Sequence, residues 1–506
     1  MTAIDPITLQ VMAGALRSVC DEMGAVLVRA AHSPNIKERR DCSTALFDRH
    51  GELVMQAEHI PVHLGSMPDA VAAVLGEEHR PGRAWVLNDP FAGGTHLPDI
   101  TVITPVFAEG ELLGFAASRA HHADVGGPTP GGMPSHSTRL EDEGLVIPPQ
   151  AIDDEGLREL AGRMRAPAQR LADLRAQLAA NAVGVQRLAA LAEREGRAGV
   201  ERAMAAILDY AERRTRARLA ALPDGEWEAR DALEGGEHGE LDIELRVRAT
   251  ISGDELELDF AGTAEQVEGN LNCPLPVTKS ASFFAVRVLI DPDAPPSAGA
   301  HRPVTVRAPE GSLVNARPPA AVAAGNVETS SRVADLVLAA LAEPAGGPAQ
   351  GQGTMNNLTL ANDRFTYYET LGGGQGACAH ADGPSAVHVA MSNTLNTPIE
   401  ALETELPVRV AELAVRRGSG GAGRRRGGEG IVRELIALEP MDFTLITERR
   451  RIAPRGRDGG ADGAPGRNYL NGRELPAKAS GSLAPGDRLR IETPGGGGLG
   501  KPEPRP

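Results

Sequence analysis

Apolar residues along the first thirty positions recur at steps of three and four, as they do on one face of a helix. This spacing joins Met12, Leu16, Val19, Met23, Val26 and Leu27 and predicts an amphipathic helix. Asp5 is suited to cap that helix, and Pro6 suits its first turn. We therefore expect a long helix that buries one face.

Beyond Pro34 the pattern changes to short apolar runs that are separated by turn residues. Five of these runs are typical of β-strands, namely residues 43–47, 51–55, 84–87, 100–107 and 112–118. The last two runs are consecutive, so we expect them to pair as a hairpin.

Residues 151–222 are rich in Arg, Ala and Leu and predict long helices over 170–191 and 200–222. We expect their arginine-rich faces to be solvated or to face a partner. From Gly225 the pattern alternates, and residues 241–249 and 255–260 predict half-buried antiparallel strands. Two more helices are predicted over 280–290 and 331–341, and strands punctuated by glycine follow from about residue 405.

These patterns predict an α+β protein of several domains with mixed or antiparallel sheets. We expect a site-bearing α/β region over 1–150, a long-helix block over 151–222, an α+β region over 223–404 and a Gly-rich β region over 405–506. The length of 506 residues fits two to four domains. The chain is 41 % hydrophobic and 24 % charged, which is typical of a globular protein with a substantial core.

Charge and cysteine content narrow the function classes. Lys+Arg 52 against Asp+Glu 68 leaves a net charge of -16, which argues against broad binding to nucleic acid. The four cysteines form no C-x-x-C, so neither a disulfide framework nor a zinc knuckle is indicated. No apolar run approaches 18 residues, and no signal-peptide pattern opens the chain. We expect a soluble, cytoplasmic protein.

Candidate chemistry concentrates in the first 150 residues, which hold nine of the thirteen histidines. His96 and Asp99 stand just before the predicted strand 100–107, and His121, His122 and Asp124 follow the strand 112–118. Both groups then lie at the same end of one hairpin. Two imidazoles and a carboxylate, completed by water, are typical of a catalytic metal site. The alternative is that the two groups are unrelated, because His-x-x-Asp is common by chance and His-His pairs often satisfy a core.

Other candidates have structural alternatives. Asp41 is either a further ligand or an ion-pair partner of Arg39 or Arg40, and the sequence alone favours pairing. His59 and His63 have the i, i+4 spacing of two ligands on a helix, but Pro61 between them argues against that helix. We interpret both as loop histidines with substrate-binding or structural roles. Nothing beside Cys42 marks it as a nucleophile, so a buried structural role is the default.

Two glycine-rich stretches match nucleotide motifs but lack their context. Residues 418–423 match G-x-G-x-x-G, yet arginines and glycines follow where a helix should begin. Residues 495–501 resemble a P-loop, yet Pro502 replaces the required Ser or Thr. We expect no ATP site within this chain.

The chain resembles the hydantoinase B / oxoprolinase family along its whole length. The resemblance is carried by residues 33–41, 57–67, 88–99, 118–127, 130–138, 269–274, 324–329, 352–357, 393–398 and 463–468. It implies the B-type subunit of a two-component, ATP-dependent enzyme. Its A-type partner, an actin/sugar-kinase-like subunit, would bind ATP with Mg and phosphorylate the substrate.

The resemblance leaves the reaction open between branches. In one branch, metal-activated water opens a cyclic amide such as hydantoin, N-methylhydantoin or 5-oxoproline. In the other, the complex carboxylates acetone or an aryl ketone. A third interpretation is a scaffold that has no chemistry of its own and completes the site of the partner.

The resemblance also implies roles for particular residues. It places one divalent transition metal, Zn, Mn or Fe, on Asp41, His96, Asp99 and His121. His122 and Asp124 match the same motif. Their adjacency to the ligands indicates that they accept a proton in the reaction or orient a ligand from behind.

Overall fold

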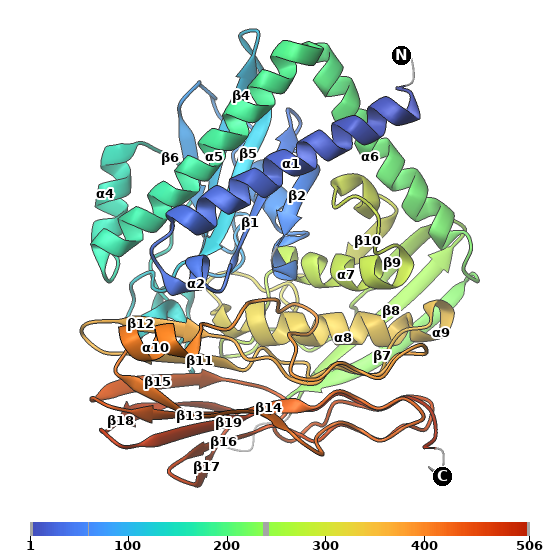
Figure 1. The fold of residues 1–506 in the computed structure, drawn as a ribbon. Coiled ribbons are helices and arrows are strands. Elements are labelled where there is room, and N and C mark those ends of the chain that lie inside the picture. The colour runs from blue at the N-terminus through green and yellow to red at the C-terminus, as the bar shows by residue number, and fades with distance from the viewer. Residues whose placement is uncertain (1–3, 59, 236–241, 503–506) are drawn as a thin grey trace.

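The computed structural model describes residues 4–58, 60–235 and 242–502. The described strands form four sheets, which are mainly antiparallel and are combined with long helices. In Figure 1 the N-terminal sheet and its helices lie at the top, α8 crosses the middle, and the C-terminal sheets lie at the bottom. This arrangement confirms the predicted α+β class.

The first helix, α1 (Pro6–Ala30), follows the predicted pattern. Asp5 accepts hydrogen bonds from the backbone N–H groups of Ile7 and Thr8, which the helix itself leaves without acceptors. The buried face consists of Met12, Leu16, Val19, Cys20, Met23, Gly24 and Leu27. Burial of each large apolar side chain stabilises the fold by about 1.5–3 kcal/mol.

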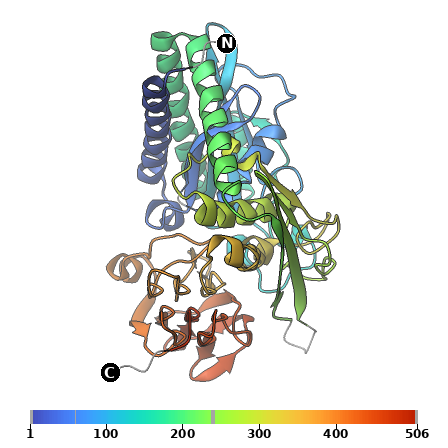
Figure 2. The ribbon, with the colours of Figure 1, turned by 90° about the vertical axis from the view of Figure 1, so that its right-hand side faces the viewer.

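The N-terminal sheet has six antiparallel strands in the order β2-β1-β5-β4-β3-β6. They are β1 (Cys42–Asp48), β2 (Leu53–Glu58), β3 (Ala84–Leu87), β4 (Asp99–Ala108), β5 (Glu111–His121) and β6 (Gln150–Ile152). The predicted hairpin is β4–β5. Helices α1 and α5 (Pro167–Glu195) cover one face of this sheet, as Figures 1 and 2 show. α3 (Met67–Ala72) packs with the apolar side chains of the other face.

The helical block contains α4 (Asp154–Gly162), α5 and α6 (Arg197–Leu219). The expectation that its arginine faces are solvated is wrong at Arg170, which is buried and lies 3.2 Å from Asp173. The Gln177 side chain of α5 donates to the carbonyl oxygens of Ile100 and Ser118. Polar side chains on this helix therefore bind the sheet, which helical periodicity alone does not predict.

The second sheet has the order β10-β9-β8-β7. Its strands are β7 (Gly225–Leu233), β8 (Ile243–Ser252), β9 (Glu255–Asp259) and β10 (Val304–Arg307), and β10 runs parallel to β9. The first residue predicted for β8, Leu241, lies outside the described residues. Helix α7 (Leu275–Ile290) begins five residues before its predicted start, and α8 (Ser330–Ala340) follows a π-helical turn, η5 (Gly325–Thr329).

The C-terminal part contains two further sheets, of four and five strands. The third sheet, β12-β11-β15-β18, consists of β11 (Asn357–Ala361), β12 (Thr366–Glu369), β15 (Met441–Ile446) and β18 (Lys478–Leu483). The fourth, β13-β14-β19-β16-β17, consists of β13 (Val408–Arg416), β14 (Gly430–Ala437), β16 (Arg467–Leu470), β17 (Arg473–Leu475) and β19 (Arg488–Glu492). One apolar core joins the two sheets.

Short helical segments complete the connections. They are α2 (Pro34–Lys37), η1 (Pro61–His63), η2 (Pro130–Gly132), η3 (Leu140–Asp142), η4 (Ala298–His301), α9 (Ala342–Ala345) and α10 (Ile399–Glu405). Across the described residues, no helix combines the length and apolar content that would let it cross a membrane.

Extended glycine-rich segments pack backbone against backbone beside these sheets, at the lower right of Figure 1. We call them the glycine bundle; they comprise residues 350–352, 373–377, 420–428, 454–464 and 494–500. A Cβ on Gly496 would lie 2.1 Å from the carbonyl oxygen of Gln375, so only glycine fits there. Both stretches that match nucleotide motifs contribute to this packing.

Candidate metal centre

The β4–β5 hairpin brings the predicted ligands together. Asp99 opens β4 and His121 closes β5, and the two residues face each other in the strand register. His96 lies three residues before Asp99, whose N–H donates to the carbonyl oxygen of His96 at 3.1 Å. The expectation that both groups lie at one end of the hairpin is confirmed.

Three side chains converge on one point. Asp99 Oδ1 lies 3.2 Å from His96 Nε2 and 3.2 Å from His121 Nδ1. The ligand atoms of the three residues all lie within 4.8 Å of one another, and all three residues are buried. The strand ends hold Asp99 and His121, and His96 lies in the turn just before β4.

The donor set fits a divalent transition metal. Among the described residues, His96 Nδ1, His96 Nε2 and His121 Nε2 are buried without a hydrogen-bond partner. Buried imidazole nitrogens are normally paired, so nitrogens without partners beside a buried carboxylate fit a site that a metal would complete. Two imidazole nitrogens and a carboxylate oxygen are ligands that Zn, Mn and Fe share.

Asp99 is the centre of the cluster and is held on both oxygens. Thr95 Oγ1 donates to Asp99 Oδ2 at 2.7 Å, and His63 Nε2 lies 3.5 Å from the same oxygen. Burial by itself would raise the pKa of Asp99. The nearby imidazoles of His96, His121 and His63 outweigh that effect and keep the pKa of Asp99 well below its ordinary value. Asp99 is therefore a permanent carboxylate.

Asp41 lines the same cavity as these three residues. Its Oδ2 accepts from Asn35 Nδ2 at 3.4 Å, and its backbone carbonyl accepts the N–H of His121. Within the described residues no ion pair joins Asp41 to Arg39 or Arg40. Arg39 lies instead 3.9 Å from Glu369. The role of Asp41 as a metal ligand stays a prediction, because Asp41 does not belong to the group of His96, Asp99 and His121.

His122 and Asp124 are placed elsewhere. His122 Nε2 lies 2.9 Å from Gln177 Oε1 on α5, and burial lowers the pKa of this imidazole to about 4. Asp124 accepts the N–H groups of Gly126 and Gly131, both at 2.7 Å. Neither residue lines the cavity that holds His96 and Asp99. Both are buried outside that cavity, His122 against α5 and Asp124 in the loop that follows β5.

Other predicted residues have distinct places. His63 lies in the η1 turn, where its Nδ1 is 2.9 Å from Ser43 Oγ and its Nε2 faces Asp99. His59 lies outside the described residues. Cys42 is buried, and burial raises the pKa of its thiol, with a further contribution from Asp41. This agrees with the structural role that we expected for Cys42.

Residues far along the chain complete what we call the His–Asp cavity. The Tyr368 ring stacks on His121, with ring centroids 4.6 Å apart. The lining residues are Asp41, Ile60, Val62, His63, His96, Asp99, His121, Asn326, Val327, Met355, Tyr368, Thr370, Ser392, Asn393 and Thr394. Sequence reasoning did not single out Thr95, Asn326 or Tyr368 as site residues, although Thr95 and Asn326 lie in stretches that carry the family resemblance. His63 was signalled by its spacing from His59 and by such a stretch, residues 57–67.

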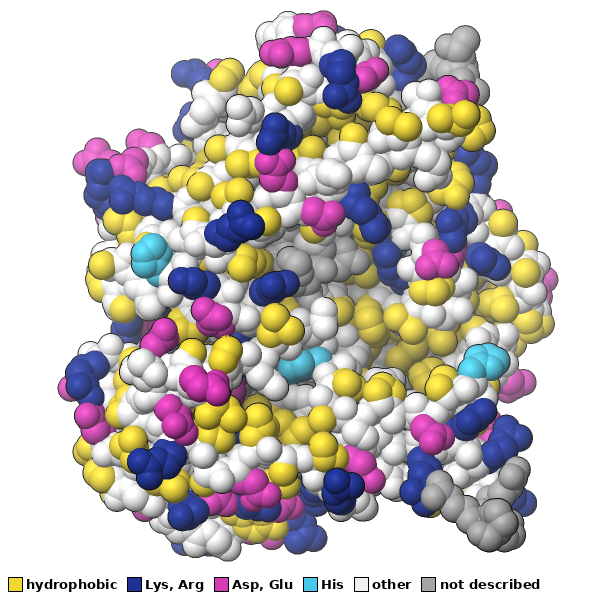
Figure 3. All heavy atoms as spheres, in the orientation of Figure 1, with side chains coloured by type: hydrophobic (Ala, Val, Ile, Leu, Met, Phe, Trp, Pro, Cys, Tyr) yellow, Lys and Arg dark blue, Asp and Glu magenta, His cyan; other side chains and the backbone are white. Residues whose placement is uncertain are grey.

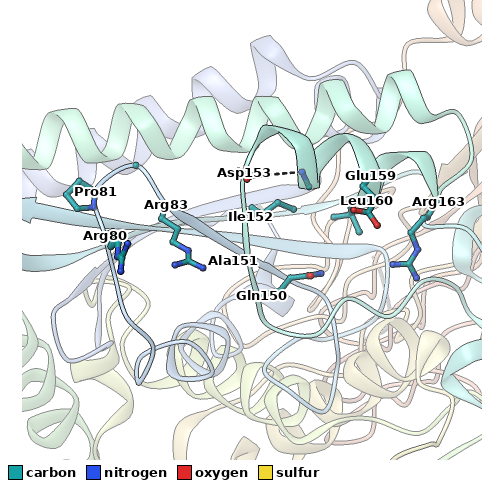
Figure 4. Close-up of a pocket in the computed structure, with 12 residues that line it drawn as sticks. Arg80, Pro81, Arg83, Gln150, Ala151, Ile152, Asp153, Glu159, Leu160 and Arg163 are labelled. Atoms are coloured by element: carbon teal, nitrogen blue, oxygen red, sulfur yellow. Dashed lines mark hydrogen bonds between the residues drawn. The ribbon is translucent and has the colours of Figure 1, made fainter.

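Two larger hollows lie elsewhere on the surface. One, of about 510 Å³, follows the edge strand β6, where the side chains of Arg80, Arg83 and Arg163 line it (Figure 4). The other is a cleft of about 1260 Å³ that includes Ser135, Asn270 and Arg450. On the face in Figure 3, acidic and basic side chains of the described residues are interspersed without a continuous basic patch.

The comparison with known families identifies the chain's relatives. A family model described as hydantoinase B/oxoprolinase matches residues 5–502. The chain belongs to the hydantoinase B/oxoprolinase family. This confirms the resemblance that the motifs carry.

Individual relatives of this family member are named as a 5-oxoprolinase and as a hydantoinase subunit. The chain is 37 % identical to a 5-oxoprolinase of Dictyostelium discoideum, covering 99 % of this chain and 41 % of that protein. It is 31 % identical to a protein of Pseudomonas sp. (strain NS671) that is named as the B-type subunit of a D-/L-hydantoinase, covering 99 % and 90 %. The chain thus spans about two fifths of the 5-oxoprolinase and nearly all of the hydantoinase relative.

A solved structure has the same fold. The ATP-dependent caprolactamase from Pseudomonas jessenii superposes with a TM-score of 0.92 at 29 % sequence identity. The match covers 99 % of this chain and 92 % of that chain. The chain therefore shares the fold of this caprolactamase over nearly its whole length.

Proposed function

We propose that this chain is the B-type subunit of an ATP-dependent cyclic-amide hydrolase that opens a ring such as hydantoin, N-methylhydantoin or 5-oxoproline. The observation that carries the proposal is the convergence of buried His96, Asp99 and His121 at one end of the β4–β5 hairpin. Their unpaired imidazole nitrogens support a metal role over a merely structural one. Membership of a family with ring-opening relatives supports the substrate class.

The proposed ligands are His96, Asp99 and His121, with Asp41 as the fourth. A divalent metal held there would lower the pKa of a water toward about 7 and so supply a nucleophile at neutral pH. Asp99 contributes a fixed negative charge, since its pKa lies well below neutral. The stacked Tyr368 ring holds the plane of His121 and keeps bulk water from that side.

We assign His122 and Asp124 to positioning instead of proton transfer at the reacting atoms. His122 is tied to Gln177, and Asp124 holds the loop that begins after His121. Each acts on the ligand His121 through the backbone between them. Replacement of Asp124 by Asn should therefore change metal affinity, and full turnover with normal metal content would remove this assignment.

ATP with Mg is assigned to an A-type partner chain. Two observations support this. The glycine-rich motifs of this chain lie in the glycine bundle, and the hydantoinase relative is named as one subunit, whereas the 5-oxoprolinase is a single, much longer chain. The proposed compartment is the cytoplasm, because no disulfide joins the cysteines of the described residues.

The first test is elemental analysis of the purified chain beside two variants. We expect about one equivalent of Zn, Mn or Fe in the wild type, and its loss in His96→Ala. His32→Ala is the matched control, because His32 lies outside the cavity. A folded wild type that takes up no metal when all three are supplied would refute the proposed chemistry.

The second test adds an A-type partner by co-expression. ATP-dependent release of the opened amino acid from 5-oxoproline or hydantoin, abolished in His96→Ala, is the expected result. Bicarbonate-dependent consumption of acetone would instead support the carboxylase branch. Ring opening that survives His96→Ala would support the third interpretation, in which this chain is a scaffold that completes the partner's site.

A further inference from the structure

Three hydroxyl residues of the His–Asp cavity and one imidazole form a hydrogen-bonded series that the proposed metal chemistry does not use. Ser392, Thr394 and Thr370 line the cavity and are buried. His388 does not line the cavity, but its Nδ1 is hydrogen-bonded to the Ser392 hydroxyl. Thr394 Oγ1 lies 3.3 Å from His388 Nε2 and 2.8 Å from Thr370 Oγ1. We call these four side chains the hydroxyl network; it begins and ends at the cavity wall.

The fold holds the hydroxyl network from two sides. A tight turn brings His388 and Ser392 together, because the N–H of Ser392 donates to the carbonyl oxygen of Val389 at 3.3 Å. Ala390 in this turn has a φ of 53°, a left-handed conformation that costs alanine about 1–2 kcal/mol and that the surrounding contacts must hold. On the other side, Nη2 of buried Arg39 donates to both threonine hydroxyls at 2.8 Å. The hydroxyls are therefore fixed by the fold itself.

His388 is a neutral imidazole at pH 7. Burial lowers the pKa of His388 to about 3, and the positive charge of Arg39 acts in the same direction. A neutral imidazole has one N–H donor and one acceptor nitrogen. Each nitrogen of His388 contacts one hydroxyl, so one of these hydroxyls donates to the ring and the other accepts from it. Ser392 and Thr394 therefore have opposite roles.

This direction continues along the network to Thr370. Thr394 Oγ1 has two lone pairs, and the N–H of Arg39 occupies one of them. Thr394 therefore accepts from one of its neighbours, His388 or Thr370, and donates to the other. The four side chains supply four hydrogens for three contacts, so one hydrogen is left over, on Ser392 or on Thr370. The network thus offers the cavity one donor and one acceptor, whichever nitrogen of His388 carries the proton.

The size of the His–Asp cavity matches a single water. Its free volume is about 20 Å³, which is enough for about one water. A buried water is held by about two to four hydrogen bonds to polar groups. One donor and one acceptor of the hydroxyl network supply two of them, on a wall that the cavity shares with His96 and Asp99.

We propose that Ser392 and Thr370 bind and orient the water that attacks the substrate, and that His388 fixes the directions of their hydroxyls. This inference rests on the proposed function and adds the residues that hold its nucleophile. One hydroxyl donates to the water and the other accepts from it, so the orientation of the water is set before the reaction, which raises the rate of attack. His388 contacts no reacting atom and acts through Ser392 and Thr394; it is a positioning residue.

The test removes the two nitrogens of His388 and then restores a donor and an acceptor. His388→Phe keeps a flat ring without nitrogen, whereas His388→Gln offers one amide donor group and one amide acceptor. Ser392→Ala is a smaller change, in case phenylalanine disturbs folding. His301→Phe is the matched control, because burial also lowers the pKa of His301 to about 3 and this residue lies outside the cavity.

Two kinds of measurement are made. For each protein, zinc content is determined, and kcat and KM for the opening of 5-oxoproline are measured in the complex with the A-type partner. Crystal structures of the intact, zinc-loaded wild type and of His388→Phe, at a resolution that shows ordered waters, report on the water directly and do not depend on activity.

We expect kcat to fall by about 10- to 100-fold in His388→Phe and in Ser392→Ala, with KM within about threefold of the wild type and unchanged zinc content. His388→Gln should keep most of the wild-type kcat, and His301→Phe should match the wild type. The wild-type crystal should show one water within about 3.2 Å of both Ser392 Oγ and Thr370 Oγ1, and His388→Phe should lose it.

Three results would overturn the inference. They are wild-type turnover in folded His388→Phe or Ser392→Ala, an equal loss of kcat in His388→Gln and His388→Phe, and a wild-type cavity in which no water contacts the two hydroxyls.

Failure of this inference can be told apart from failure of the proposed function. If the wild-type complex opens 5-oxoproline and folded Ser392→Ala does so at the same rate, only the role of the hydroxyl network is wrong. If the wild-type complex opens no ring, both proposals fail.

Discussion

Thr95→Val should weaken Zn²⁺ binding to the intact chain by about 10- to 100-fold without unfolding it. Thr95 Oγ1 donates to Asp99 Oδ2 at 2.7 Å, and both side chains are buried. Valine has nearly the same shape but no O–H group. The substitution therefore frees one oxygen of a proposed ligand and leaves the ligand itself in place.

The magnitude follows from the strength of that bond. A hydrogen bond to a buried carboxylate contributes about 1.5–3 kcal/mol, and about 1.4 kcal/mol corresponds to a tenfold change in affinity. His63 Nε2, at 3.5 Å from the same oxygen, can recover part of the loss by moving closer. Residues that orient a metal ligand typically change affinity by about 10- to 100-fold.

The assay is competition for Zn²⁺ with a chromophoric chelator at constant pH. Thr101→Val is the matched control, since Thr101 lies on β4 together with Asp99, but its Oγ1 accepts from Arg119 and does not contact Asp99. We expect its affinity to stay within about threefold of the wild type. Wild-type affinity in a folded Thr95→Val, or equal loss in both variants, would refute the reasoning.

Three further perturbations test other parts of the structure. Burial raises the pKa of Glu143 to about 7 from 4.5, so the folded chain keeps this proton longer than the unfolded chain. The free energy of unfolding of the wild type should therefore fall by about 3 kcal/mol between about pH 4.5 and 7, relative to that of Glu143→Gln. Urea unfolding at several pH values measures this difference, and parallel pH profiles of the two proteins would contradict the reasoning. Asp231→Ala removes a carboxylate 3.0 Å from buried Arg449 and should cost about 3–5 kcal/mol in the same assay; a cost under about 1 kcal/mol would show that the charges reorganise. Gly325→Ala would place a Cβ 1.8 Å from the carbonyl oxygen of Asn272, so the π-turn must move. Because this turn lines the His–Asp cavity, ring opening should be lost while zinc content stays normal. Unchanged turnover would show that the site does not depend on the position of the turn.

The cluster of His96, Asp99 and His121 was predictable because local patterns determine it. Strand periodicity predicted the hairpin, and positions next to the strand ends placed His96, Asp99 and His121 at one end. The remaining walls include residues such as Met355 and Tyr368, which lie far along the chain from these ligands. No local periodicity reports such a contact, so only the folded chain reveals these walls.

The elements were predicted least well where side chains carry no periodic signal. Helix α7 begins at Leu275, before the apolar pattern becomes clear, because Pro274 sets its entry. On α5 the polar residues Arg170 and Gln177 are buried, because Arg170 pairs with Asp173 and Gln177 donates to the carbonyl oxygen of Ile100. Hydrophobic periodicity assigns polar residues to the solvent-exposed face, so it does not predict this burial. The glycine-rich region was predicted as strands, but part of it consists of extended segments without any alternation to detect.

The glycine bundle constrains the order in which the chain completes its fold. Residues 494–500 exchange backbone hydrogen bonds with several earlier segments, including the bonds from Gly374 N–H to Pro494 O and from Gly497 N–H to Gln350 O. Until this segment is inserted, those earlier segments have buried backbone groups without partners. The bundle can therefore close only after residues 494–500 have been synthesised. A chain that stopped near residue 490 would keep every proposed metal ligand but would lack residues 494–500. Backbone groups of the glycine bundle would then have no partners, and we expect chaperones and proteases to bind such a chain.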